Sequence, residues 1–202
     1  MAAGEARVVG PEDLQRAVRS VADIFQADRV VIVGSQALLV GRDDIERSLR
    51  MSVEIDAYPA NVHEWERMHP GQEASEVINA LLGEGSQFHA THGFFVDGVD
   101  DRTAWLAPDW QDRAVRRVID LDNRKVEAIA PEPNDLVASK LARGDPKDVQ
   151  FARICLRSGL VRHDEVRSRL EIIMPEDMLG TALTRLRQAT HGRTPGAPGI
   201  GR

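Results

Sequence analysis

The chain has 202 residues, 42% of them hydrophobic and 29% charged, which is typical of a globular protein and leaves room for one domain or two small lobes. Its single cysteine, Cys155, excludes a disulfide framework and a thiolate metal site. Residues 1–29 contain no apolar run of signal-peptide length, and no run in the chain reaches the roughly 18 apolar residues of a membrane span. We therefore expect a cytoplasmic protein that makes no membrane contact.

Charge is distributed unevenly along the chain. The formal net charge is −6, which argues against a protein coated with basic residues for nucleic acid. Residues 1–110 carry 9 Lys and Arg against 19 Asp and Glu, whereas residues 111–202 carry 17 against 13. This asymmetry is expected if the first part holds a metal ion and the second meets phosphates, although solvated helical surfaces would also produce it.

The first predicted elements are an amphipathic helix and a buried strand. Residues 11–25 have apolar side chains at three- and four-residue spacings, which predicts a helix packed under a sheet. Residues 29–33 form a β-branched run that favours a buried strand and ends at Gly34-Ser35. A helix over residues 36–40 should follow. Gly34 permits a tight turn, so Ser35 and the first helical N–H groups would face outward, where they could bind a phosphate.

The next predicted strand, residues 52–58, carries two carboxylates on one face. Its alternation with period two places Glu54 and Asp56 on one side and apolar residues on the other. Mg²⁺ prefers oxygen ligands and usually combines one or two carboxylates with substrate phosphates and water. Next to Gly34-Ser35, the pair therefore predicts a site for a divalent metal and a nucleoside triphosphate. Taken alone, the same pattern fits a solvated edge strand equally well.

The middle of the chain is predicted to alternate helices, strands and turns. The expected helices cover residues 61–68 and 74–82, and the expected strands cover residues 87–96, 118–121 and 125–129. Hairpin turns are expected at Asp97-Gly98 and at residues 122–123. Four arginines near the later strands could line a phosphate path or lie exposed: Arg113, Arg116, Arg117 and Arg124.

A third carboxylate could complete the acidic pair. Asp97 is one candidate to face Glu54 and Asp56, and Asp120 and Glu127 are the others. For each of the three, the alternative is an ordinary turn or surface acid.

Pro131-Glu132-Pro133 separates the strand-rich part from a helical remainder. We therefore expect a first lobe of residues 1–130, a helical lobe of residues 131–193 and a disordered tail of residues 194–202. Asn134 is predicted to cap the first helix of this part, and further helices are predicted to begin at Lys147, His163 and Pro175. Lys140 lies in the first of these helices and Asp148 opens the second, where both would be solvated in most proteins.

Together these residues resemble a known superfamily. Gly34-Ser35 followed by Glu54-Ile55-Asp56 is similar to the GS…[D/E]xD signature of the polymerase-β-type nucleotidyltransferases. Within that superfamily the chain resembles the AbiEii-like (MenT-type) nucleotidyltransferase toxins of bacterial toxin–antitoxin systems. The likeness extends over residues 29–160 and includes S-x-E-I-D-x-Y-P, H-G-F-F-V-D-G-V, and the helices that carry Lys140 and Asp148.

The resemblance implies an α/β (α+β) fold, in which a polymerase-β-type nucleotidyltransferase lobe with a small mixed sheet is followed by a helical lobe, with the active cleft between them. It implies transfer of a nucleotide from an NTP to an acceptor hydroxyl. Glu54 and Asp56 would hold Mg²⁺, and backbone N–H groups of Gly34 and Ser35 would receive the β and γ phosphates.

The resemblance also assigns roles to the helical lobe and suggests partners. Lys140 would bind the triphosphate, and Asp148 would position that lysine or help to arrange the substrate. The implied acceptor is the 3′ end of tRNA, and the implied protein partner is a cognate antitoxin.

Two other functions remain open. The chain could modify a protein or a small molecule, as an antitoxin-type adenylylating enzyme or an antibiotic-modifying enzyme does. It could also be a nonenzymatic binding protein that keeps the fold, because the first carboxylate is Glu54 rather than Asp and 18 residues separate it from Ser35, a longer gap than is usual in the superfamily.

Overall fold

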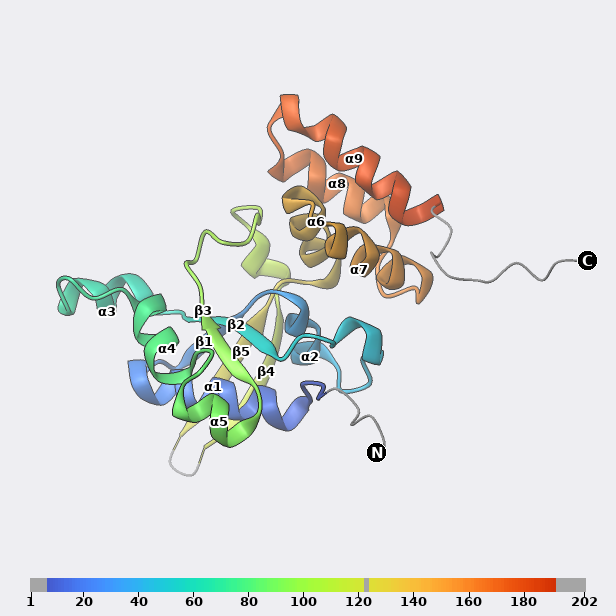
Figure 1. Ribbon diagram of the computed structural model, residues 1–202. Helices are drawn as coiled ribbons and strands as arrows, with labels where there is room; N and C mark the ends of the chain where they lie inside the picture. Colours follow the sequence, from blue (N-terminus) through green and yellow to red (C-terminus); the bar gives the residue numbers. More distant parts are fainter. Residues whose placement is uncertain (1–6, 122–123, 192–202) are drawn as a thin grey trace, which may run out of the picture.

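The computed structural model describes residues 7–121 and 124–191 and contains a five-stranded mixed sheet with helices on its faces (Figure 1). The strands, in chain order, are β1 (Arg29–Ile32), β2 (Glu54–Pro59), β3 (Phe95–Gly98), β4 (Val115–Asp120) and β5 (Lys125–Ala130). Their order across the sheet is β3-β2-β1-β5-β4. The central strand β1 is antiparallel to β2 and parallel to β5, while the outer pairs are parallel for β2 and β3 and antiparallel for β4 and β5. The predicted α/β fold with a small mixed sheet is confirmed.

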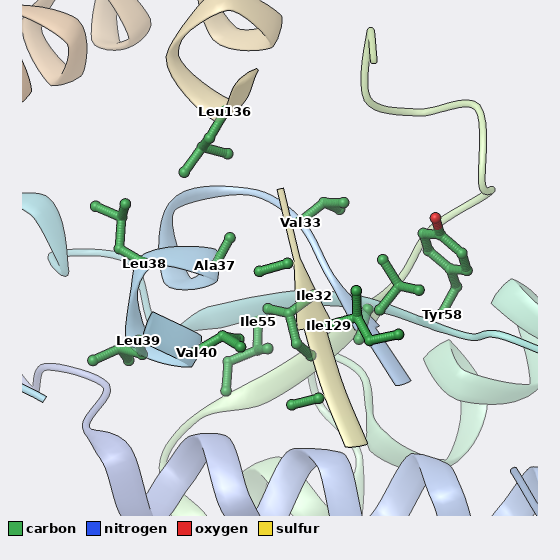
Figure 2. Close-up of a cluster of buried hydrophobic side chains, with 14 of the residues drawn as sticks. Ile32, Val33, Ala37, Leu38, Leu39, Val40, Ile55, Tyr58, Ile129 and Leu136 are labelled. Carbon is green, nitrogen blue, oxygen red and sulfur yellow. The ribbon is translucent and has the colours of Figure 1, made fainter. Parts of the chain in front are cut away.

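One face of the sheet rests on α1 (Pro11–Phe25), the blue helix of Figure 1. This helix begins at Pro11 as predicted, and the Asp13 carboxylate accepts a hydrogen bond of 3.1 Å from the backbone N–H of Gly10. Ile32 and Ile55 point from the sheet towards α1 and are fully buried (Figure 2). The apolar alternation of the strands thus determines which face is covered by α1 and which face remains for polar residues.

Shorter helices occupy the connections between strands. They are η1 (Ser35–Ala37), α2 (Leu38–Gly41), η2 (Arg47–Leu49), α3 (Val62–Met68), α4 (Ala74–Leu82), α5 (Gln87–His92) and η3 (Trp110–Arg113). α4 and α5 both contact β3. The helices predicted over residues 61–68 and 74–82 are confirmed.

The strand predicted over residues 87–96 is wrong for most of its length, because Gln87–His92 is the helix α5. The Ser86 hydroxyl accepts a hydrogen bond of 3.1 Å from the His89 N–H, and Gly93 ends the helix with φ +71°. These two caps outweigh the β propensity of the intervening residues. The predicted hairpin turn at Asp97-Gly98 is also wrong, since both residues lie within β3.

The last four helices gather beyond one end of the sheet, in orange to red in Figure 1. They are α6 (Pro133–Arg143), α7 (Pro146–Arg157), α8 (His163–Ile173) and α9 (Glu176–His191). The predicted cap of the first, Asn134, is wrong: the helix begins at Pro133, and the Glu132 carboxylate caps it by accepting the Asn134 N–H at 3.0 Å.

Buried side chains of the sheet and of the last four helices belong to one continuous core. Figure 2 shows Leu136 of α6 above Ala37, with its side chain directed towards the residues that follow β1. The division into two lobes at residues 130 and 131 stays a prediction. The expected turn at residues 122–123 and the expected tail of residues 194–202 lie outside the described residues. Within the described part of the chain, no helix combines the length and the apolar character that crossing a membrane requires.

Candidate active site between the sheet and helices α6 and α7

The turn after β1 brings Gly34 against the carboxylate of Asp56. Gly34 has φ +66°, and a Cβ at this position would overlap the Asp56 side chain. Only glycine therefore satisfies both the left-handed backbone and the close approach. The predicted helix follows as the three residues of η1 and the four of α2. Such a short helix contributes little dipole, so any phosphate binding here depends on N–H groups and nearby cations.

Two hydrogen bonds, one to β2 and one to the residues just before it, align the carboxylates with this turn. The Val33 N–H donates to the Asp56 carbonyl at 3.0 Å. The buried Gln36 side chain donates through Nε2 to the Ser52 carbonyl at 2.9 Å. The backbone on both sides of Glu54 is therefore joined to the residues that surround Gly34.

Three carboxylates share one face of the sheet, which we call the acidic face: Glu54, Asp56 and Asp97. Glu54 and Asp56 are two residues apart on β2, and Asp97 lies opposite Asp56 in the parallel pairing of β2 and β3. Burial raises the pKa of Asp56 to about 6, helped by the negative charges of Glu54 and Asp97. Burial, with the charge of Glu54, also raises the pKa of Asp97. The acidic face thus concentrates negative charge in a partly desolvated place.

The other candidates for a third carboxylate lie elsewhere on the sheet. Asp120 is on the edge strand β4 and forms an exposed ion pair of 3.5 Å with Lys125. Glu127 is on β5 and accepts a hydrogen bond of 3.0 Å from Arg116. Of the three, only Asp97 is brought beside the predicted pair. Within the described residues, no three His, Cys, Asp or Glu side chains form a cluster that could hold a metal by themselves.

The facing surface comes from α6 and α7, and we call it the basic face: Lys140, Arg143 and Lys147. Asp148, which is 1% exposed, organises two of its members. It accepts hydrogen bonds of 2.9 and 2.8 Å from Nε and one terminal nitrogen of Arg143, and its Oδ1 lies 3.5 Å from Nζ of Lys140. Lys140 is only 7% exposed, and its ammonium lies 4.7 Å from the centroid of the Phe151 ring.

The electrostatics of the basic face follow from these contacts. Burial lowers the pKa of Lys140, against the opposing influence of Asp148 and Asp56. Burial also opposes ionisation of Asp148, but the hydrogen bonds from Arg143 and the charge of Lys140 outweigh it and hold the pKa of Asp148 below its usual value. Each buried charge on this face therefore has a partner.

Glu54 and Asp56 of the acidic face and all three residues of the basic face line a cavity of about 390 Å³, the main cavity, which lies in the size range of small-molecule sites. A second, smaller hollow of about 50 Å³, the side hollow, shares Asp56, Lys140 and Arg143 with it. The predicted site residues all line one or both of these spaces: Gly34 in the side hollow, Ser35, Glu54 and Asp148 in the main cavity, and Asp56 and Lys140 in both.

The sequence interpretation overlooked Arg143 as a site residue, although it lines both spaces. Its position three residues after Lys140 was the available signal, because residues at this spacing share a helix face. The four arginines considered for a phosphate path have other partners. Arg113 pairs with Asp135, Arg116 with Glu127 and Arg117 with Asp43, while Arg124 donates to carbonyls at the end of α1.

A mixed sheet that presents paired carboxylates beside a Gly-Ser turn, followed by helices that present cations across a cavity, defines the class of the nucleotidyltransferases. The chain belongs to the family described as "Nucleotidyltransferase of unknown function (DUF6036)", which its residues 12–171 match. No curated protein and no solved structure shows significant similarity to the chain.

Proposed function

We propose that the protein transfers a nucleotide from an NTP to an acceptor hydroxyl, with release of pyrophosphate. The observation that carries this proposal is the opposition of the acidic and basic faces across the main cavity, with Gly34 packed against Asp56. A triphosphate needs cations around its oxygens, and a divalent metal needs carboxylates next to those oxygens. Membership of a nucleotidyltransferase family supports the same reaction.

The residues present fit Mg²⁺. Glu54 and Asp56 offer hard oxygen donors on one face, and Mg²⁺ commonly takes its remaining ligands from substrate phosphates and water, so two carboxylates suffice. We infer that these two residues hold the metal. When bound, Mg²⁺ would supply electrostatic stabilisation of the charge that develops on the phosphoryl oxygens.

The protein's own groups would then position the reactants. N–H groups at Gly34 and Ser35 would bind the β and γ phosphates, and Lys140 and Arg143 would neutralise the leaving pyrophosphate. The acceptor oxygen forms a bond to the α-phosphorus. At the same time the bond from the α-phosphorus to the oxygen that bridges the α and β phosphates breaks, and the electron pair of that bond leaves with pyrophosphate. The carboxylate of Asp97 would accept the hydroxyl proton. Asp148 would act as a positioning residue that holds Lys140 and Arg143 in place.

The acceptor we propose is the 3′ end of tRNA, with the protein acting in the cytoplasm as a toxin that a cognate antitoxin restrains. The support is the resemblance of Gly34-Ser35, Glu54-Ile55-Asp56, Lys140 and Asp148 to the AbiEii-like (MenT-type) toxins.

The test is incubation with Mg²⁺ and each NTP labelled at its α-phosphate, in the presence of total RNA or of cell protein. We expect label in the tRNA band and none with Asp56→Asn. Asp120→Asn is the matched control, because it removes an exposed carboxylate at the far edge of the same sheet and should leave transfer unchanged. Label in protein bands alone would reject tRNA as the acceptor. Failure to bind any Mg²⁺-NTP by calorimetry would reject the enzymatic function itself.

A further inference from the structure

Part of the main cavity is lined by apolar side chains from two segments of the chain. Leu49 and Met51 come from the segment between α2 and β2, and Phe151 and Ile154 come from α7. Leu49 and Phe151 are almost fully buried, whereas Met51 is 54% exposed. The cavity therefore has an apolar surface that begins in the core and ends in contact with solvent.

The segment that carries Met51 is fixed to the body of the protein. Arg50 donates to the Ile45 carbonyl at 2.9 Å and to the Val9 carbonyl at 2.8 Å, and the Ile45 and Leu49 side chains are buried. η2, within the same segment, packs against α7. Residues 45–50 are thus anchored to the rest of the protein, so the apolar surface is preorganised for a ligand.

The apolar surface is continuous with the residues directed at phosphate. Ser35, Lys140 and Arg143 line the same cavity as Met51 and Ile154. A triphosphate held by the first group has its nucleoside attached, and that nucleoside must lie in the rest of the cavity or in the side hollow.

The side hollow is too small to receive a base. Its volume of about 50 Å³ accommodates only a few water-sized groups. The main cavity, at about 390 Å³, has the space, and its apolar side chains match the faces of a nucleobase.

We propose, on the basis of the nucleotidyl transfer proposed above, that Met51 and Ile154 form the binding site for the base of the incoming NTP. The base lies against these two side chains, and the triphosphate extends from it towards Lys140, Arg143 and Ser35. The long segment between Ser35 and Glu54 therefore has a function in this chain, since it carries one wall of the base site.

The experiment distinguishes binding of the base from binding of the phosphates by using two ligands. Calorimetry measures the Kd of inorganic tripolyphosphate and of the tightest-binding α,β-methylene NTP among the four bases, both with Mg²⁺. We expect Met51→Ala to raise the Kd of the NTP analogue roughly tenfold and to change the Kd of tripolyphosphate by no more than about twofold. Ile154→Ala should show the same pattern. Met68→Ala is the matched control, because Met68 is 59% exposed on α3, away from the cavity, and both Kd values should stay unchanged.

Two results would overturn the base site while leaving the proposed function intact. One is an unchanged Kd of the NTP analogue in both Met51→Ala and Ile154→Ala. The other is an equal loss of affinity for the analogue and for tripolyphosphate, which would mean that the two side chains affect the phosphate site. A wild-type protein that binds neither ligand would instead overturn the proposed function, and the base site with it.

Discussion

The acidic and basic faces of the main cavity carry opposite charges and differ in how those charges are compensated. On the basic face, Asp148 bridges Arg143 and Lys140 through short contacts, so the buried charges are paired within the protein. On the acidic face, burial and repulsion from the negative charges of Glu54 and Asp97 raise the pKa of Asp56 to about 6. The basic face is therefore preassembled, whereas the proposed function of the acidic face requires a cation from outside the protein.

The largest expected effect is on the acidic face. Asp56→Asn should reduce nucleotide transfer by at least about 100-fold, because it removes a proposed metal ligand. The same change should not lower the stability of the metal-free protein, because it relieves repulsion with Glu54 and Asp97. Transfer assays and thermal unfolding with and without Mg²⁺ measure both effects. Mg²⁺ should stabilise the wild type more than the variant. A variant that retains wild-type transfer would place the reaction at another site.

The same substitution on the basic face should have the opposite effect on stability. Asp148→Asn leaves Lys140 buried and Arg143 without its bidentate partner, so we expect a loss of about 3 kcal/mol in the free energy of unfolding. Asp145→Asn is the matched control. Asp145 is exposed and pairs with Arg143 at 3.3 Å, and Asn also caps helices well, so the loss should stay below about 1 kcal/mol.

The effect of Asp148 should also depend on pH. Its pKa is lowered by Arg143 and Lys140, so the stability that it contributes is present above the unfolded-state pKa of about 4 and is lost as the pH falls through the folded value. The difference between wild type and Asp148→Asn, measured by urea unfolding, should therefore shrink in acid. A difference that is constant with pH would contradict the ion pair as its cause.

A smaller effect is expected where the turn meets the acidic face. Gly34→Ala should cost about 2 kcal/mol of stability and should reduce transfer, because it adds both backbone strain and a clash with Asp56. Gly71→Ala tests the backbone strain alone, because Gly71 has φ +84° but open space around it. We expect a loss of about 1 kcal/mol in stability and unchanged transfer. Equal transfer in the two variants would argue against a functional contact between Gly34 and Asp56.

The smallest effect is spectroscopic and reports on the surroundings of the acidic face. Tyr58, the only tyrosine of the chain, is two residues beyond Asp56 on β2. Burial, with the charges of Asp101 and Asp100, raises its pKa to about 12. Tyrosinate absorbance should therefore develop near pH 12 in the folded protein and near about 10 in urea. Because the raised pKa favours the neutral form, the associated stability is lost as the pH rises from the unfolded towards the folded value. A midpoint near 10 in the folded protein would contradict this.

Sequence patterns predicted much of the fold because the relevant forces act over short distances. The apolar spacing of residues 11–25 and the β-branched run before Gly34 were sufficient to predict α1 and β1. The prediction failed at residues 87–96, where caps at Ser86 and Gly93 determine the helix α5 although the composition favours a strand. The composition of the segment was misleading because the capping residues at its two ends determine its structure.

The amino-acid sequence by itself determined that Glu54 and Asp56 share one face of a strand and that a glycine turn precedes it, because strand alternation and backbone freedom are local properties. The tertiary structure decided which acid stands beside that pair, since Asp97 reaches Asp56 only when β3 adds in parallel to β2 after three intervening helices. It also decided that Arg143 and Met51 border the same cavity as Asp56. These contacts join residues far apart in the chain, and packing between the sheet, α6 and α7 produces them, which no local pattern encodes.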